Sequence, residues 1–560
     1  MLFISTGPSS REVSFETTLL NPIPEPGHLW MPKCLPQVNW PSCSAPLWKF
    51  VSAALTSLVG RDCSAPCEKA LRDFEIALER ETPEILALQL HRGPTKSFKD
   101  VGCRVAAALY QTFLSENNQR VIVATSGDTG SAAADAFDNV CVLYPEGRVS
   151  TYQEKQMLSR ENATCLAVRG DFDRCQHLVK AILEKREALS CNSVSLARLL
   201  PQIGMYAWAA SQAPHHVYFV PSGNYGNAVA CLMAKQMGAA IQQVHMACNQ
   251  NGNALVRWLA GRDDAYRPSD TVETPATAMD VGRPSNAVRL FHLLSSSEEM
   301  SSQSIRASVV SKNDIITMTD RTVCPHTACA LHVALSVSCP GKIIVRTADA
   351  CKFPTRVAMQ IQSNEESAPF VLRNPKALFK KCRVILLVGM PGTGKSTLSG
   401  CLGGHDSDKT MIRDRRETNL PKVIKTFASA DAFIEYEGRT IVNMIEETRR
   451  HQETPTTVIA TGGSAVHSNV LYEFVTNTAD VLIVWLRRYG EEELVSADEW
   501  NTRGVLVPTG VDVRSALDLK RLRNPLYAEI ADLELRTDVW DARRCTKALE
   551  RVMKYWNTRN

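Results

Sequence analysis

The stretch HHVYFVPSGNYGNAVACLMAKQMG, residues 215–238, combines three local patterns that together predict one type of fold. It begins with an apolar run rich in β-branched and aromatic residues, continues through a loop of Ser, Gly and Asn, and ends in an Ala-rich helix. The stretch QRVIVATSGDTGSAAADAF, residues 119–137, repeats this order. Strands that alternate with helices in this way are typical of a parallel sheet in an α/β fold.

The two loops in these stretches are candidate anion sites, because ligands of α/β folds bind at the carboxyl ends of the strands. The loop SGNYGN, residues 222–227, has two glycines that let backbone N–H groups turn inward before a helix, which favours a phosphate. The loop TSGDTG, residues 125–130, adds the hydroxyls of Ser126 and Thr129 and would suit a carboxylate.

Two lysines follow a Gly-Pro turn in GPTKSFKD, residues 93–100. Lys96 and Lys99 alone would indicate little, because most lysines are solvated surface charges. Together with two anion loops, however, a lysine indicates a cofactor that carries a phosphate and an aldehyde. Pyridoxal phosphate fits, since a lysine binds its aldehyde and a Gly-rich loop holds its phosphate.

Ordered motifs in residues 1–360 resemble the threonine synthase family of fold-type-II pyridoxal-phosphate enzymes, whose fold is similar to that of the tryptophan synthase β subunit. The resemblance implies a small N-terminal subregion, two α/β subdomains, and the conversion of O-phosphohomoserine and water to threonine and phosphate. The motifs are FISTGPSSREVSFETTLL (3–20), GPTKSFKD, ATSGDTGSAAADAF (124–137), LYPEGRVSTYQEKQM (143–157), NSVSLARLLPQI (192–203), VPSGNYGNAVA (220–230), AMDVGRPSN (278–286), CPHTA (324–328) and TADACKFP (347–354).

The resemblance assigns the Schiff-base lysine to Lys99, which would also be the main proton carrier, and places Lys96 at a variable position. Phe98 would help to desolvate the Lys99 amine, and burial lowers the pKa of a lysine. Asp100 belongs either to this site or to the start of a helix. The expected cofactor-binding residues are Lys99, Asp128, Ser222, Gly223, Asn224, Tyr225, Gly226, Asn227 and Thr347. The expected substrate-binding residues are Thr125, Ser126, Gly127, Thr129, Lys155 and Arg198.

A second domain is predicted after the polar, Pro-containing segment 361–382, which we interpret as a linker. The segment 383–402 is a strand, a Gly-rich loop and a helix, and its GMPGTGKS satisfies the P-loop pattern. This predicts a P-loop NTPase α/β domain over residues 383–560 that binds ATP and Mg²⁺. The residues expected at the nucleotide are Gly389, Pro391, Gly392, Thr393, Gly394, Lys395, Ser396 and Thr397.

The second domain resembles shikimate kinase over about residues 383–537. The motifs are HDSDK (405–409), DAFIEYEG (431–438), VIATGGSAV (458–466), VLIVWLRR (481–488), TRGVLVP (502–508) and RNPLYAEIADLEL (523–535). The resemblance implies that Ser396 and Asp406 serve Mg²⁺, that Arg503 comes from a lid over the nucleotide, and that the phosphate acceptor contacts Asp408, Gly462, Gly463 and Arg523.

This second resemblance is incomplete. Ile434 stands where the family has the arginine that grips the carboxylate of shikimate, and Ser464 replaces a glycine. The segment between Lys395 and Asp406 is also short for the family. The phosphate acceptor therefore stays open at this point, and so does catalytic activity.

The first domain also departs from its family. The chain between Asn286 and Cys324 is short, Arg283 replaces an acidic residue, and Asp349 replaces a histidine.

Three alternatives to a threonine synthase with an added kinase-like domain stay open. They are a phospholyase that degrades phosphorylated hydroxy-amino acids, a homoserine kinase fused to a threonine synthase, and a C-terminal domain that is a non-catalytic regulatory module.

Composition narrows the classes of protein further. The chain has 560 residues, of which 44% are hydrophobic and 22% charged, which is ordinary for a globular protein of several domains. A net charge of +4 without a basic face argues against a nucleic-acid partner, and apolar runs long enough to cross a membrane are absent. The eighteen cysteines are scattered singly, and no secretory signal is apparent, so we expect a cytoplasmic protein with small-molecule substrates. The oligomeric state stays undetermined.

Overall fold

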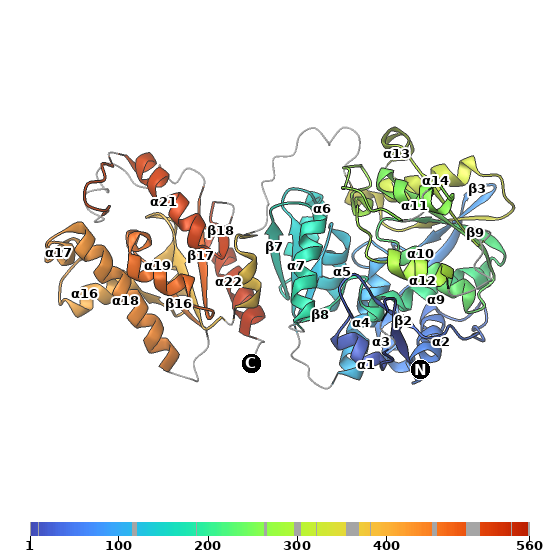
Figure 1. The fold of residues 1–560 in the computed structure, drawn as a ribbon, viewed down its shortest axis with the longest axis horizontal. Coiled ribbons are helices and arrows are strands. Elements are labelled where there is room, and N and C mark those ends of the chain that lie inside the picture. Colours follow the sequence, from blue (N-terminus) through green and yellow to red (C-terminus); the bar gives the residue numbers. More distant parts are fainter. Residues whose placement is uncertain are drawn as a thin grey trace. The chain divides into compact units, whose positions relative to one another are not determined.

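The computed structural model describes most of the chain, and its contacts divide it into two compact units (Figure 1). Unit 1 comprises Met1–Ala163 and Gly170–Asn364, and unit 2 comprises Thr164–Arg169 and Glu365–Asn560. The described residues are 2–8, 11–114, 120–185, 188–262, 266–295, 304–320, 322–353, 369–380, 382–450, 456–488, 505–513, 515–538 and 540–557.

Unit 1 contains a sheet in the order β11-β10-β9-β12-β4-β3, a second sheet whose strands run β6-β5-β8, and a small antiparallel pair, β1 and β2. In the first sheet only the pairing of β3 with β4 is antiparallel among the described strands. The strands are β1 Phe3–Ser5, β2 Trp30–Pro32, β3 Ala77–Thr82, β4 Ile85–Gln89, β5 Val121–Ala124, β6 Val140–Pro145, β8 Leu189–Ser190, β9 His216–Pro221, β10 Ile241–Cys248, β11 Ile305–Val309 and β12 Lys342–Arg346.

Helices follow most of these strands, as the alternating pattern predicts. Within unit 1, α14 packs on β9, β10 and β12, while α10 packs on β10 and on α9 (Figure 1). The helices are α1 Phe15–Leu20, α2 Leu47–Val59, α3 Ser64–Leu71, α4 Lys99–Phe113, α5 Asp128–Ala136, α6 Thr151–Leu158, α7 Phe172–Glu184, α8 Leu196–Leu199, α9 Pro201–Gln212, α10 Gly226–Gln236, α11 Asn253–Leu259, α12 Ala287–Ser295, α13 Lys312–Met318 and α14 Pro325–Ser336. Short 3₁₀ turns are η1 Gln250–Gly252, η2 Thr277–Met279 and η3 Ala350–Lys352.

Local sequence explains where these elements start and what they bury. Every residue of β6, VCVLYP, is buried, as expected for a parallel strand covered on both faces. Helix α6 begins at a capping box, in which the Ser150 side chain accepts from the Gln153 backbone N–H and the Gln153 side chain accepts from the Ser150 N–H. Helix α14 has Pro325 at its first position, where a missing N–H costs nothing.

Unit 2 is built on a sheet whose strands run β15-β16-β14-β17-β18-β13-β7, parallel except for the pairing of β18 with β13. Its apolar core lies between β14, β16, β17 and the helices that cover them. The strands are β7 Ala163–Val168, β13 Phe370–Leu372, β14 Val384–Val388, β15 His405–Asp406, β16 Thr457–Ala460, β17 Val481–Arg487 and β18 Leu533–Arg536. The helices are α15 Lys395–Cys401, α16 Ser407–Asp414, α17 Leu420–Ile424, α18 Ala430–Arg450, α19 Asn469–Thr476, α21 Ala516–Ile530 and α22 Ala542–Asn557, with 3₁₀ turns η5 Pro375–Phe379 and η6 Ala465–His467. The α/β class predicted for both parts of the chain is confirmed.

The segment 361–382, interpreted from sequence as a linker, is structured where the model describes it. Its β13 pairs with β7 and β18, and the Arg373 guanidinium donates to Glu534 at 2.8 Å. Residues 361–368 and 381 lie outside the described residues. The described part therefore belongs to unit 2, because β13 is short and apolar and finds its pairing partners far away in the chain.

In the parts of the chain that the model describes, none of the helices combines the length and apolar character needed to span a bilayer. The eighteen cysteines are all free thiols. Among the described residues, no group of three or more His, Cys, Asp or Glu side chains is arranged to hold a metal ion.

Candidate functional site

Lys99 is the first residue of α4, and the local chain holds it there. The Phe98 N–H donates to the Thr347 carbonyl oxygen at 2.9 Å, which ties the start of α4 to the end of β12. Asp100 accepts from the Thr95 N–H at 3.0 Å and also binds the Thr95 hydroxyl. Asp100 therefore braces the turn in front of the helix, which is the structural role weighed for it from the sequence.

Lys96 has a different environment. Its backbone is left-handed, with φ of 58°, and its side chain is 42% exposed. Its Nζ donates to the Cys351 sulfur at 3.2 Å and lies 4.0 Å from Asp349. Asp349, one of the departures from the family, otherwise caps η3. These contacts agree with the interpretation that Lys99, and not Lys96, faces the site.

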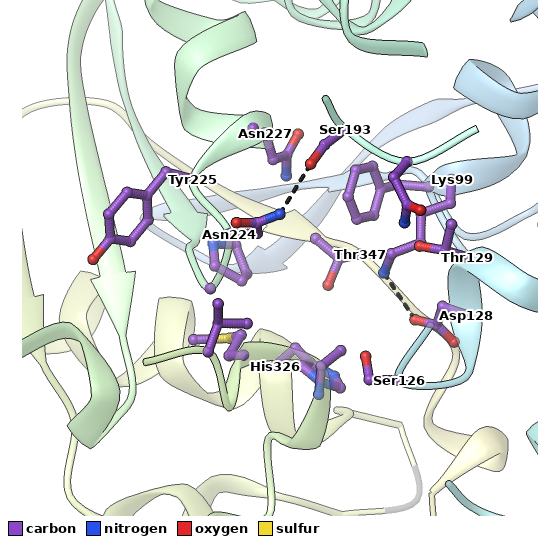
Figure 2. A pocket seen from close by; sticks show the side chains of 18 of the residues that line it. Lys99, Ser126, Asp128, Thr129, Ser193, Asn224, Tyr225, Asn227, His326 and Thr347 are labelled. Carbon is purple, nitrogen blue, oxygen red and sulfur yellow. Dashed lines mark hydrogen bonds and ion pairs between the residues drawn. The ribbon is translucent and has the colours of Figure 1, made fainter. Parts of the chain in front are cut away.

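The Lys99 ammonium faces a buried carboxylate (Figure 2). Its Nζ lies 3.1 Å from Asp128 Oδ2, and its ammonium also lies 4.6 Å from the centre of the Phe98 ring. Burial lowers the pKa of Lys99, and the nearby cations Arg198 and Lys352 lower it further, against the opposing effect of Asp128. A larger share of this amine is therefore neutral and able to accept a proton than in an exposed lysine.

Asp128, the first residue of α5, is the centre of this charged network. Its Oδ1 lies 2.6 Å from Lys352 Nζ and accepts from Gln153 Nε2 at 2.8 Å. Burial by itself would raise the pKa of Asp128, but Lys352 and Lys99 outweigh that effect and hold it well below its usual range. The carboxylate is thus ionised and keeps two buried ammonium groups in place.

A pocket of about 780 Å³, including the space at its mouth, opens beside Lys99. It gathers residues from α4, α5, the loops after β8 and β9, α10, and the ends of β12 and α14 (Figure 2). The predicted residues that line it are Lys99, Ser126, Asp128, Thr129, Arg198, Gly223, Asn224, Tyr225, Gly226, Asn227 and Thr347.

The other predicted residues of the first site lie elsewhere. Thr125 Oγ1 accepts from the N–H groups of Gly127 and Gly130, each at 2.9 Å, and so shapes the loop. Ser222 donates to the Val220 carbonyl at 2.8 Å. Lys155 is exposed on α6 and is not among the residues that line the pocket. Thr125, Gly127 and Ser222 therefore support the loops, and Lys155 belongs to the surface.

The loop SGNYGN turns sharply beside the pocket, which five of its residues line. Tyr225 has φ of 59°, and its side chain points away from Lys99 (Figure 2). Asn224 donates to the Ser193 hydroxyl at 3.0 Å. A Cβ on Gly223 would lie 2.6 Å from Met279 Cα, so only glycine fits there.

Several buried polar atoms of the pocket have no partner among the described residues. They are Asn227 Nδ2, Arg198 Nε, His326 Nδ1 and Gln202 Oε1. Buried polar groups are normally hydrogen-bonded, and an unpaired one costs about 1–3 kcal/mol. An oxygen-rich, anionic ligand between these groups and Lys99 would accept hydrogen bonds from the Asn227, Arg198 and His326 nitrogens, whereas Gln202 Oε1 would need a donor. Pyridoxal phosphate with an anionic substrate fits the three nitrogen donors.

Sequence reasoning did not single out several residues of this site: Gln153, Ser193, His326 and Lys352. His326 Nε2 accepts from the Ala278 N–H at 3.1 Å, and burial lowers its pKa to about 4. All four lie inside the quoted motifs, so position in a motif was the available signal. The roles of Gln153, His326 and Lys352 are visible only once α6, α14 and η3 converge on Asp128, and that of Ser193 only through its bond to Asn224.

The P-loop in unit 2 adopts the conformation its glycines allow. Gly389, Gly392 and Gly394 have φ of 147°, 84° and 93°. The buried Lys395 donates to the carbonyl oxygens of Gly389 and Met390 at 2.8 and 3.0 Å, and burial lowers its pKa to about 8. The loop thus surrounds the lysine that is expected at the β- and γ-phosphates.

Two pockets flank this loop. Gly392, Thr393, Gly394 and Thr397 line one of about 900 Å³, together with Trp540. Ser396 and Asp406, the residues expected at Mg²⁺, line another of about 610 Å³. Pro391 and Gly389 lie in the loop between them, and Arg503 lies outside the described residues.

The residues expected at the phosphate acceptor converge around one loop. A Cβ on Gly462 would lie 2.0 Å from Glu437 Oε1 and 2.6 Å from Asp408 Oδ1, and one on Gly463 would lie 2.7 Å from Arg523 Nη1. Tyr527 donates to the carbonyl oxygens of Gly463 and Gly389 at 3.0 Å each, which joins this loop to the P-loop.

Comparison with known proteins assigns the two parts of the chain to different families. Residues 71–344 match the family of pyridoxal-phosphate dependent enzymes, and residues 391–553 match the shikimate kinase family. The protein is therefore a pyridoxal-phosphate dependent enzyme of α/β fold with a shikimate kinase-like P-loop domain.

Threonine synthase from Haemophilus influenzae is 34% identical over 305 residues, which are 50% of this chain and 71% of the relative. Threonine synthase from Escherichia coli is 35% identical over 262 residues, which are 44% of this chain but 60% of the relative. The crystal structure of the Escherichia coli enzyme superimposes with a TM-score of 0.58 at 29% identity, covering 63% of this chain and 89% of that one. A threonine synthase from Brucella melitensis, solved with PLP bound, gives 0.56 at 27%, covering 65% and 92%. The chain belongs to the threonine synthase family.

Proposed function

We propose that unit 1 is a threonine synthase, which converts O-phosphohomoserine and water to threonine and phosphate. The observation that carries this proposal is the buried Lys99–Asp128–Lys352 network at the edge of a pocket whose unpaired polar atoms would suit a phosphate and a carboxylate. The relatives described above are also named threonine synthases.

In this proposal the cofactor, pyridoxal phosphate, supplies an electron sink for negative charge that develops on the substrate carbons. The loop 222–227 would hold its phosphate through backbone N–H groups, and the Thr347 hydroxyl would face its ring nitrogen. The Lys99 amine would take and return protons at Cα, Cβ and Cγ of the substrate, because burial lowers its pKa and leaves more of it neutral than in an exposed lysine.

The substrate would be oriented by groups on the other side of the pocket. Ser126 and Thr129 would receive its carboxylate, and Arg198 would face its phosphate, which leaves from Cγ before water adds at Cβ. Arg198 is buried, and its Nη2 lies 3.4 Å from the Thr129 hydroxyl. A guanidinium suits this task because it forms paired hydrogen bonds with phosphate oxygens.

Phosphate and threonine formation from synthetic O-phosphohomoserine tests this function. Threonine and phosphate in equal amounts would support a synthase. Phosphate with 2-oxobutyrate and ammonia in place of threonine would show the phospholyase reaction, which uses the same lysine but lets the product decompose.

For unit 2 we propose that the P-loop binds ATP with Mg²⁺. Lys395 would move from its carbonyl partners to the β- and γ-phosphates, while Ser396 and Asp406 would face the metal ion. The observation that supports this is the pair of pockets on either side of the loop, one lined by its glycines and one by Ser396 and Asp406. Equilibrium binding of a fluorescent ATP analogue, with and without Mg²⁺, tests it.

A further inference from the structure

Three charged side chains of unit 2 meet at the loop Gly462–Gly463, and we call them the acceptor cluster: Asp408, Glu437 and Arg523. They come from α16, α18 and α21. Glu437 and Asp408 crowd the same point beside Gly462, and Arg523 approaches the next residue, Gly463. An ion pair or hydrogen bond between the guanidinium and either carboxylate is not found among the described residues.

Each member of the acceptor cluster has one polar atom without a partner among the described residues: Asp408 Oδ1, Glu437 Oε1 and Arg523 Nη1. Glu437 and Arg523 are each only 1% exposed, so water does not compensate them freely. Their remaining atoms are engaged, since Ser464 donates to Glu437 Oε2 and Arg523 Nη2 donates to the Leu506 carbonyl. The free atoms therefore point to a bound group that offers both hydrogen-bond donors and acceptors.

The charge of this cluster is unbalanced toward the negative. Lys395 is held by P-loop carbonyl oxygens, and the residue one helical turn before Glu437 is the buried, apolar Ile434. Burial and the nearby Asp408 raise the pKa of Glu437, because two carboxyl groups crowd one buried point beside Gly462. A ligand with a positive group beside Glu437 would remove that penalty.

We propose that unit 2 phosphorylates a small hydroxy-amino acid, which binds with its ammonium on Glu437, its carboxylate on Arg523 and its hydroxyl toward Asp408. An organic ammonium suits the cluster better than a metal ion, because the Arg523 guanidinium of α21 approaches the same loop and the described residues form no metal-binding group. An anionic polyol without an ammonium would leave the Glu437 carboxylate without a counter-charge.

The reaction is a transfer of the γ-phosphoryl group of ATP. The hydroxyl oxygen of the amino acid forms a bond to the γ-phosphorus, the bond from that phosphorus to the β–γ bridging oxygen breaks, and ADP leaves. The hydroxyl proton passes to Asp408 and then to solvent. The choice of homoserine among hydroxy-amino acids rests on the function proposed for unit 1, because its phosphate ester is that unit's substrate. The ammonium site itself rests on the acceptor cluster.

ADP formation by the full-length protein, with ATP and Mg²⁺, tests the proposal. We expect turnover with L-homoserine and not with shikimate. Two truncated analogues test the contacts with Glu437 and Arg523 one at a time. 4-Hydroxybutyrate lacks the ammonium, and 3-aminopropan-1-ol lacks the carboxylate. The affinity of each should be lower than that of homoserine by a factor of about ten or more. Because this assay does not involve Lys99, its failure is distinct from failure of unit 1 on synthetic O-phosphohomoserine.

The variant Glu437→Gln keeps the shape of the side chain and removes its charge. It should raise the KM for homoserine about ten-fold or more while ATP binding is retained. Glu446→Gln, on the same helix at a side chain 41% exposed, is the matched control and should leave the KM unchanged. Four results would each overturn the proposal. Two concern the substrate: turnover with shikimate alone, or equal use of 4-hydroxybutyrate and homoserine. The others are an effect of Glu437→Gln on Mg²⁺ dependence only, and ATP binding without any amino-acid phosphorylation. The last result would favour a regulatory module.

Discussion

The Nζ atom of Lys99 lies 3.1 Å from Oδ2 of Asp128, so the first residue of α4 faces the first residue of α5. The lysine is buried enough to have a lowered pKa, yet it opens onto the pocket that gathers the other candidate residues. Both properties are needed in a lysine that binds an aldehyde and then moves protons. The predictions below start from this pair and extend to the rest of the chain.

Lys99→Ala should abolish threonine formation and the visible absorbance that the bound cofactor gives, because it removes the amine that faces the pocket. Lys96→Ala is the matched control, since Lys96 is exposed and directed to Cys351 and Asp349. Absorbance spectra and a phosphate-release assay check both variants. If Lys96→Ala lost the absorbance while Lys99→Ala kept it, the assignment of the reactive lysine would be reversed.

Asp128→Asn should destabilise unit 1 strongly, because it leaves the buried ammonium groups of Lys99 and Lys352 without their counter-charge. Breaking a buried ion pair costs about 3–5 kcal/mol. Asp135→Asn, at the end of the same helix, loses ion pairs with the more exposed Arg104 and Arg160 and should cost about 1 kcal/mol or less. Urea unfolding followed by circular dichroism compares the two, and equal losses would contradict the importance assigned to burial.

Gly223→Ala should weaken cofactor binding, because the new Cβ would lie 2.6 Å from the backbone Cα of Met279 and would displace the anion loop. Gly147→Ala is the control. Its Cβ meets open space, and only its φ of 69° opposes the change, at about 1 kcal/mol. Titration of the apoprotein with pyridoxal phosphate measures both affinities. Unchanged binding in Gly223→Ala would place the phosphate at another loop.

Stability should fall as the pH is lowered from about 6.5 to 4, in part because of His326. Burial lowers its folded pKa to about 4, whereas in the unfolded chain it takes up a proton near 6.5. The unfolded state therefore binds more protons in this interval, and stability decreases as the pH falls. His326→Asn should flatten this dependence, while His332→Asn on the same helix should not. Unfolding free energies measured in urea between pH 4 and 7 decide the matter.

Lys395→Ala should abolish binding of ATP to unit 2, because the P-loop lysine supplies the positive charge at the β- and γ-phosphates. Lys422→Ala is a suitable control, since this lysine is exposed on α17 and lines neither of the two pockets beside the P-loop. Binding of a fluorescent ATP analogue measures the effect. Threonine formation by unit 1 from O-phosphohomoserine should continue in both variants, and loss of that activity would reveal a dependence on unit 2 that we do not expect.

Much of the site could be predicted from sequence because its parts are local. A P-loop and a strand–glycine loop–helix unit each occupy fewer than about 25 consecutive residues, and their chemistry depends on the backbone conformation that glycine allows. Lys99, the loop 222–227 and Lys395 belong to this group, and the structure places all of them in or beside pockets. The motifs of the pyridoxal-phosphate enzyme all precede the P-loop motifs in the chain, which indicated two domains.

Other features depend on residues far apart in the chain. Lys352 and Gln153 reach Asp128 only because η3 and the start of α6 lie beside the start of α5, and the exposure of Lys155 follows from its place on the outer side of α6. The unbalanced acceptor cluster likewise required α16, α18 and α21 to meet at one loop. The reactive groups and backbone loops of this protein can thus be identified from its sequence alone. Which of those groups are buried together depends on the packing of the folded chain, because burial and ion pairing are properties of packed elements and not of the segments that carry the residues.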